Sequence, residues 1–117
     1  MSLRIIKPYQ ISEIRFVDSD TLEGWVRISS TLHELWRIRL RGIEGGEKGT
    51  PEGDHAETHL RRILDENRDC PLHFLGLESV RDQYGRRVGD LVLADGKLLT
   101  LTLLATGAYW RRDRSPS

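Results

Sequence analysis

This sequence lacks cysteine pairs, long apolar runs and an excess of either charge, and each absence excludes a class of protein. The only cysteine, Cys70, cannot close an intramolecular disulfide or build a cysteine-based zinc cluster. No apolar run approaches the roughly 20 residues that a membrane span needs, so we expect no membrane partner. Residues 1–8 lack the apolar stretch and cleavage site of a signal peptide, which leaves the compartment open.

The charges are balanced, with 18 Lys and Arg against 18 Asp and Glu. A net charge of zero gives no global attraction to nucleic acid, so any phosphate binding has to come from a local patch. The length of 117 residues suits a single domain with one modest hydrophobic core. We therefore expect residues 1–117 to form one domain.

The first half of the sequence predicts three strands joined by tight turns. Strands are expected at 10–17 and 22–28, with polar turns at 18–20 and 29–31. A third strand follows, because apolar and arginine residues alternate with a period of two over 36–41. The alternation places the apolar side chains on one face and three guanidinium groups on the other. The apolar residues are Trp36, Ile38 and Leu40, and the basic ones are Arg37, Arg39 and Arg41.

The second half mixes helices and strands. Residues 42–53 hold five glycines and Pro51, which predicts a loop. Apolar residues then recur every three or four positions, which predicts a helix over 54–67. Extended segments are expected at 71–77, with Leu72, Phe74 and Leu77, and at 88–94. Residues 98–105 fit either a buried helix or a strand, and Gly107 suits the end of the helical alternative. Residues 111–117 are typical of a frayed tail.

The pair Asp18 and Asp20 can be tested against known carboxylate motifs. The dehalogenase-type phosphatase signature requires Thr or Val where Leu22 stands. An EF-hand loop requires Gly and Glu where Glu23 and Ser29 stand. Both readings fail, and the pair alone predicts no more than a surface turn.

Two further segments carry residues suited to phosphate chemistry. Residues 39–47 begin with Arg39 and deliver Glu44 and Glu47 on a glycine-rich loop, and residues 82–86 form a turn ending in Arg86. Metal-assisted phosphodiester cleavage needs carboxylates for a hard cation, a base near the attacking water and cations near phosphorus. Arginine suits the last task because its planar fork grips phosphate and keeps its charge. Together with Asp20, these residues supply each role.

In these motifs and their order the sequence resembles the staphylococcal nuclease (thermonuclease) family over about residues 10–110. The matching segments read Asp18-Ser-Asp-Thr-Leu22, Arg39-Leu-Arg-Gly-Ile-Glu-Gly-Gly-Glu47 and Asp82-Gln-Tyr-Gly-Arg86. They are followed by Ala94-Asp-Gly-Lys97 and a leucine-rich segment that ends at Gly107. The resemblance implies an α+β fold: a five-stranded β-barrel of the oligonucleotide-binding type with packed helices.

The resemblance also implies site residues. Asp20 and Glu44 are expected to ligate Ca²⁺ together with the backbone carbonyl of Gly45. Glu47 is expected to position or deprotonate the attacking water. Arg39 and Arg86 are expected to grip the scissile phosphate. Tyr84 is expected beside the terminal phosphate of a nucleotide. The implied reaction is hydrolysis of single-stranded or denatured DNA and RNA to 3′-phosphorylated products, in a family whose members are often secreted or periplasmic.

The sequence departs from the family at several positions. Glu44 replaces the usual aspartate, and Gly46 replaces a proline, from which we expect a more flexible loop and slow cleavage. The family's helix beyond the position of Trp110 is expected to be missing, which leaves a surface suited to self-association. These departures keep open an alternative function, a catalytically degenerate barrel that binds nucleic acid or protein.

Other polar and aromatic residues have a structural interpretation. His55 and His59 have a zinc-binding spacing, but no third ligand is suggested and a solvated helix face is favoured. Trp25 and Trp36 are expected to pack in or around the barrel rather than stack on bases.

Overall fold

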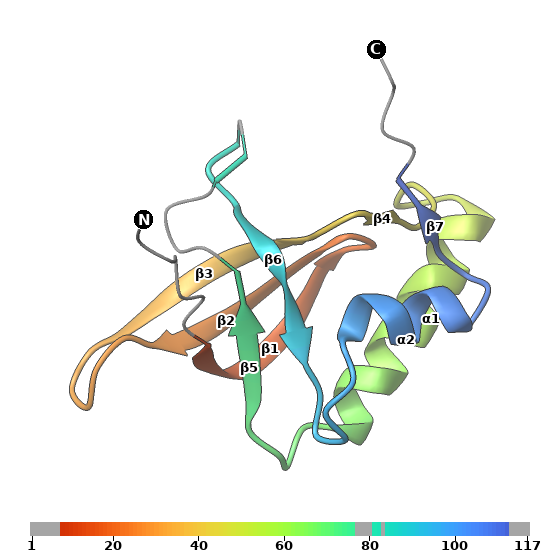
Figure 1. Ribbon diagram of the computed structural model, residues 1–117. Coiled ribbons are helices and arrows are strands. Elements are labelled where there is room, and N and C mark those ends of the chain that lie inside the picture. The colour runs from red at the N-terminus through yellow and green to blue at the C-terminus, as the bar shows by residue number, and fades with distance from the viewer. Residues whose placement is uncertain (1–7, 77–80, 83, 113–117) are drawn as a thin grey trace, which may run out of the picture.

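The computed structural model of the protein, described here for residues 8–76, 81–82 and 84–112, is a closed five-stranded barrel with two helices beside it (Figure 1). The order of strands around the barrel is β1-β2-β3-β6-β5. This arrangement confirms the predicted α+β fold with a barrel of the oligonucleotide-binding type. The barrel strands are β1 (Tyr9–Asp18), β2 (Thr21–Arg27), β3 (His33–Leu40), β5 (Leu72–Leu75) and β6 (Arg87–Val92).

The first three strands form the predicted antiparallel meander, and a parallel pair closes the barrel. In β3, Trp36, Ile38 and Leu40 are buried, as their alternation with arginine predicts. Residues 38–40 of β3 then pair in parallel with residues 87–89 of β6. β1 bends around the barrel at an irregularity between Ser12 and Arg15, where Glu13 has a φ of 50°.

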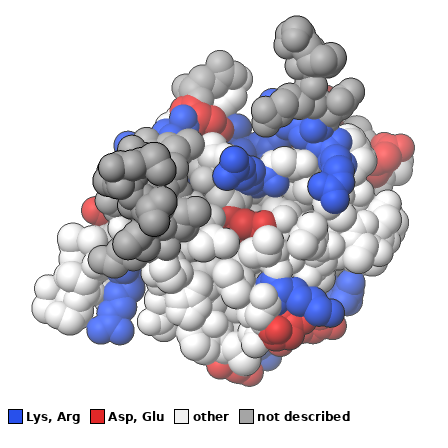
Figure 2. All heavy atoms as spheres, viewed as in Figure 1, with Lys and Arg blue, Asp and Glu red and all other residues white. Residues whose placement is uncertain are grey.

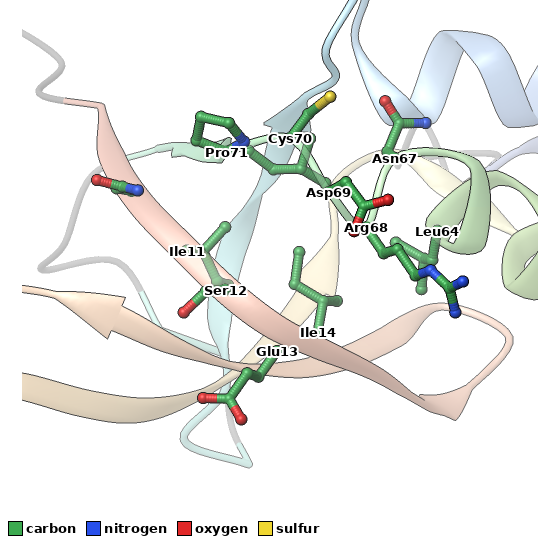
Figure 3. A pocket seen from close by; sticks show the side chains of 12 residues that line it. Ile11, Ser12, Glu13, Ile14, Leu64, Asn67, Arg68, Asp69, Cys70 and Pro71 are labelled. Atoms are coloured by element: carbon green, nitrogen blue, oxygen red, sulfur yellow. The ribbon is translucent and has the colours of Figure 1, made fainter.

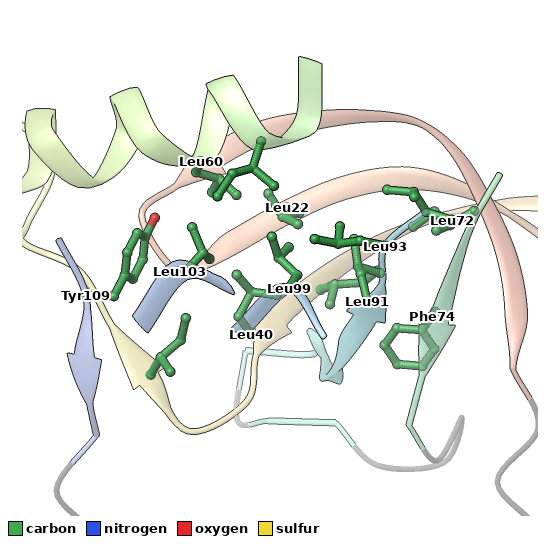
Figure 4. Close-up of a cluster of buried hydrophobic side chains, with 14 of the residues drawn as sticks. Leu22, Leu40, Leu60, Leu72, Phe74, Leu91, Leu93, Leu99, Leu103 and Tyr109 are labelled. Carbon is green, nitrogen blue, oxygen red and sulfur yellow. The ribbon is translucent and has the colours of Figure 1, made fainter. Parts of the chain in front are cut away.

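The hydrophobic core fills the barrel and the space between the barrel and the helices (Figure 4). Helix α1 (Pro51–Glu66) contributes the stripe of Ala56, Leu60 and Ile63, which is fully or almost fully buried. Burying a large apolar side chain contributes about 1.5–3 kcal/mol, so this face holds the helix in place. Barrel and helix residues that are fully buried include Leu22, Ile38, Leu60, Phe74, Leu91, Leu99 and Leu103.

Helix α1 begins at Pro51, three residues before the predicted start. Thr50 is the N-cap, and its hydroxyl accepts a hydrogen bond from the Gly53 N–H at 3.0 Å. Proline suits the first helical position because its missing N–H would have no partner there. Pro51 therefore marks a helix start and not, as predicted, part of a loop.

The ambiguous segment 98–105 forms a helix, α2 (Leu99–Ala105). Asp90 of β6 accepts hydrogen bonds from the N–H and hydroxyl of Thr100, which fixes the first turn to the barrel. Gly107 follows the C-cap residue Thr106 with a φ of 81°, a left-handed conformation that glycine adopts without steric cost. The predicted role of Gly107 is confirmed.

Two further segments pair with each other, one from the predicted loop and one where the predicted tail begins. β4 (Ile43–Glu44) and β7 (Trp110–Arg111) form a small antiparallel sheet outside the barrel. The Arg112 N–H also donates to the Gly42 carbonyl at 2.9 Å. The predicted strand residue Leu77 and residues 113–117 of the predicted tail lie outside the described residues. Within the part of the chain that is described, neither helix is long and apolar enough to cross a membrane.

Candidate functional site

The barrel brings three segments far apart in the sequence to one place. Asp20 lies in the turn between β1 and β2, and its carbonyl accepts a hydrogen bond from the Leu40 N–H at the end of β3. Thr21 is the register partner of Arg39. Arg86 directly precedes β6, whose first residue pairs with Ile38 of β3. Asp20, Arg39 and Arg86 therefore meet at one edge of the barrel.

Arg39 is the buried centre of this group, with 5% of its surface exposed. Its guanidinium donates to the carbonyls of Leu40 and Ile43. It also lies 3.4 Å from a carboxylate oxygen of Asp20 and 3.9 Å from one of Glu44. The prediction that Arg39 faces away from the apolar residues of β3 is correct, but its side chain is enclosed by the chain turning at 40–44.

The electrostatics at Arg39 combine opposing effects. Burial lowers the pKa of its guanidinium, and the carboxylate of Asp20 opposes this shift. Arg112 and Arg86 lower the pKa further because they carry the same charge. An arginine keeps its charge in proteins, so the group stays cationic. Arg112 therefore acts on the site electrostatically, although residues 111–117 were expected to be a frayed tail.

Arg86 is held by two neighbours. Its Nε donates to Asp82 Oδ2 at 2.6 Å, and its Nη1 donates to the Thr21 hydroxyl at 2.8 Å. The same hydroxyl donates to Asp20 Oδ1 at 2.9 Å, so Thr21 joins the guanidinium to the carboxylate. Arg86 Nη1 itself lies 4.0 Å from Asp20 Oδ1. Thr21 is buried and was missed in the sequence, where a strand threonine gives no functional signal.

Asp82 fixes both the backbone and the side chain of Arg86. Its Oδ1 accepts hydrogen bonds from the N–H groups of Tyr84 and Arg86, both at 2.9 Å. Burial alone raises the pKa of Asp82, but the hydrogen bonds from Arg86 and Tyr84 outweigh it, and the pKa lies below its ordinary value. Asp82 is therefore the ionised anchor of this turn.

Of the three acidic residues expected at the site, the two expected to hold a metal lie together, and the expected base lies apart from them. Asp20 and Glu44 both lie beside Arg39. Glu47 is exposed, in the loop before α1. Across residues 8–76, 81–82 and 84–112, no three His, Cys, Asp or Glu side chains are grouped as metal ligands. The structure thus joins two of the three expected acidic side chains to one guanidinium.

The loop of Gly45 and Gly46 is closely packed rather than flexible. A Cβ atom at Gly46 would lie 2.4 Å from Glu52 Cβ, and one at Gly45 would lie 2.7 Å from Ala56 Cβ. Both distances are too short for a real side chain, so only glycine lets the loop approach α1 this closely. The flexibility expected from the loss of a proline is offset by this packing.

Tyr84 lies at the tip of the turn before β6 and is 73% exposed. Its ring is 5.2 Å from the Arg86 guanidinium carbon, so it borders the arginine without enclosing it.

Figure 2 shows that basic side chains also gather where β4 and β7 lie in the view of Figure 1. The neutral protein thus carries the local basic patch that phosphate binding requires.

Three other features lie apart from this site. His55 and His59 contact each other on α1, with Nε2 atoms 3.1 Å apart. Trp36 packs in the barrel as predicted, whereas Trp25 is exposed. A hollow between β1 and the end of α1 is lined by both apolar and polar residues together with Cys70, and it contains none of the residues of this site (Figure 3).

Comparison with known proteins finds two relatives. A probable staphylococcal-like nuclease CAN1 of Oryza sativa subsp. japonica is 31% identical over 84 residues, which is 72% of this chain. The chain is distantly similar to a staphylococcal-like nuclease. An uncharacterized 38.1 kDa protein of Capnoides sempervirens is 32% identical over 79 residues, or 68% of the chain.

The two similarities cover only part of each relative. The chain spans about a quarter of the length of the relatives it matches, 24% and 22% respectively. No family model matches the chain. The similarity supports a nuclease-like relationship, and the barrel is consistent with it.

Proposed function

We propose that the protein is a phosphodiester hydrolase that cleaves DNA or RNA and depends on calcium. One observation carries the proposal: the guanidinium groups of Arg39 and Arg86 converge on the carboxylate of Asp20. Neighbouring strands fix both groups before any substrate binds. The distant similarity to a staphylococcal-like nuclease points to the same chemistry.

The two arginines suit the charge that develops on phosphorus. A pre-positioned guanidinium stabilises a transition state better than a mobile one, because no reorganisation is needed during the reaction. Arg39 is fixed by the carbonyls of Leu40 and Ile43, and Arg86 by Asp82 and Thr21. A phosphate entering this edge would replace the carboxylates as their partner.

The donors at the site fit a calcium ion in chemistry. Asp20 and Glu44 offer hard carboxylate oxygens, which calcium prefers. Calcium also accepts backbone carbonyls and water, so the Gly45 carbonyl and solvent would complete a site that has two side-chain ligands. When bound, the ion would neutralise charge on the phosphate.

Glu47 is the proposed base. Its carboxylate would take a proton from water as the water oxygen bonds to phosphorus. The bond from phosphorus to the 5′ oxygen then breaks, and that oxygen receives a proton, which leaves a 3′-phosphate and a 5′-hydroxyl. The backbone of Glu47 is fixed for this task, because its carbonyl accepts hydrogen bonds from the N–H and hydroxyl of Thr50 at 3.1 and 2.6 Å.

A second function, nucleic-acid binding without cleavage, is favoured by the position of Glu47. Its side chain is exposed, and no ion pair among the described residues joins it to the arginines of the site. A barrel that has lost catalysis could keep Arg39 and Arg86 for phosphate binding alone.

The test is cleavage of denatured DNA with calcium and with a chelator, for the wild type and Glu47→Gln. Glu66→Gln is the matched control, because Glu66 is exposed at the far end of α1 and pairs only with Arg62 among the described residues. We expect slow calcium-dependent cleavage that Glu47→Gln abolishes and Glu66→Gln retains. Absence of cleavage in every lane, with the DNA still bound, would establish the binding function instead.

A further inference from the structure

We infer that the outer face of β2 and β3 binds single-stranded nucleic acid beyond the cleaved phosphate, with Trp25 as a base-stacking platform. The inference rests on the proposed function, since it extends that site along the substrate. It is carried by the register of the two strands and by an exposed tryptophan that the core does not use.

The strand register makes this face continuous with the site. Successive outward pairs along β2 and β3 are Thr21 with Arg39, Glu23 with Arg37, and Trp25 with Leu35. The pairs between them, such as Leu22 with Ile38, point into the barrel. A ligand bound where Asp20, Arg39 and Arg86 meet therefore reaches Arg37 and then Trp25 if it follows the strands.

The length of this path suits a few nucleotides. Four residues separate Arg39 from Leu35, which is about 13 Å along a strand. Stacked nucleotides rise by about 3.4 Å, so the face accommodates up to roughly four of them. A single mononucleotide at Arg39 would leave Trp25 untouched.

The apolar end of the face is exposed. Trp25 is 41% exposed and its cross-strand partner Leu35 is 49% exposed. An aromatic ring presented by a rigid strand binds any base by stacking, without sequence preference. In a duplex the base faces are already stacked, so this surface favours a single strand.

The charges around the tryptophan are those of a polyanion site. Trp25 shares a groove with three arginines, Arg37, Arg81 and Arg87. The one carboxylate in the groove, Glu34, accepts from the Trp36 indole at 2.8 Å and lies 4.0 Å from Arg87 Nη2.

The neighbouring carboxylate of Glu23 is likewise matched by cations. It accepts from Arg37 Nε at 3.2 Å and is also paired with Arg15. Two cations face one anion, so a net positive charge remains beside the path. In barrels of the oligonucleotide-binding type, ligands bind on the face formed by strands 2 and 3.

The experiment measures binding of a labelled dT12 oligonucleotide in EDTA, so that no cleavage is needed for the readout. Trp25→Ala is compared with Leu101→Ala, which truncates an exposed apolar side chain on α2. Arg37→Gln is compared with Arg62→Gln on α1. We expect Trp25→Ala to weaken dT12 binding by about tenfold or more, and the ratio of dT12 to dinucleotide affinity to fall with it. Arg37→Gln should reduce the salt slope by about 0.7.

Several results would overturn the inference. Unchanged dT12 affinity in Trp25→Ala would exclude stacking there. If Trp25→Ala lowered the affinity for dT12 and for a dinucleotide by the same factor, Trp25 would have a merely structural role. A wild type that dimerises through this face, with Trp25→Ala monomeric, would make the occupant a second copy. Failure of the proposed cleavage alone would leave the dT12 result standing, because that measurement requires no catalysis.

Discussion

The buried hydroxyl of Thr21 offers the sharpest test of how the site is held together. It accepts a hydrogen bond from Arg86 and donates one to Asp20. Thr21→Val replaces the hydroxyl by a methyl group of similar size, and so removes both bonds while filling the same space. Thr21→Ser keeps the hydroxyl and loses only a methyl group, which makes it the matched control.

The expected magnitude follows from the exposure of the partners. A hydrogen bond to a charged group contributes about 1.5–3 kcal/mol to stability. The side chains of Asp20 and Arg86 are 23% and 24% exposed, so water replaces part of what the hydroxyl supplied. We therefore expect Thr21→Val to lower the free energy of unfolding by about 2 kcal/mol in total. For a domain of this size, that lowers the Tm by roughly 8 °C.

The assay is urea unfolding of a double-mutant cycle built from Thr21→Val and Arg86→Gln. If the hydroxyl acts through Arg86, the two effects are not additive and differ by about 1 kcal/mol or more. A Thr21→Val protein within about 0.5 kcal/mol of wild type, or strictly additive effects, would refute the proposed bridge.

Two further predictions concern the loop and the barrel surface. Gly53→Ala would gain about 1 kcal/mol of helix propensity, but its Cβ would lie 1.9 Å from the Glu47 carbonyl oxygen, and overpacking costs about 1–3 kcal/mol, so we expect a net loss of up to about 2 kcal/mol on urea unfolding. A Gly53→Ala protein more stable than wild type would show that the loop containing Glu47 shifts to make room for the Cβ atom. The hydrogen bond from Arg15 holds the pKa of Glu23 below its ordinary value, against the effect of burial. Ionised Glu23 therefore contributes its full stabilisation of the fold at pH values above its unfolded pKa of about 4.3. That stabilisation is lost as the pH falls through the lower pKa of the folded state. Glu23→Gln should then show a shallower loss of stability below about pH 4.3 in urea midpoints taken from pH 3 to 7, and an unchanged slope would contradict this assignment.

The parts of the fold that were predicted correctly depend on local patterns. The alternation of apolar and basic residues in β3 and the helical spacing of Ala56, Leu60 and Ile63 state which face is buried. Periodicity also separated the helix from the strands. Gly107 was assigned correctly because a left-handed residue after a helix has a strong preference for glycine.

The features that were missed depend on contacts between distant residues. β4 and β7 are only two residues long, and each has the other as its strand partner. Such short segments carry no period of their own. Pro51 was misread because proline is common both in loops and at the first helical position.

The candidate site shows the same division. The resemblance to a nuclease family named Asp20, Arg39 and Arg86, and the structure brings these three together. The resemblance did not indicate that the barrel would enclose Arg39, or that Thr21 would join Asp20 to Arg86. These relations arise from strand register, which is set by the whole barrel rather than by neighbouring residues.

The pairing of β4 with β7 also determines when the site can form during synthesis. Asp20, Arg39 and Glu44 leave the ribosome early, but the strand that aligns the backbone of Glu44 includes Trp110. The contacts between Asp20 and Arg39 need only the first three strands, whereas the backbone pairing of Glu44 has to wait for Trp110. Any binding that depends on the alignment of Glu44 is consequently delayed until Trp110 has been made.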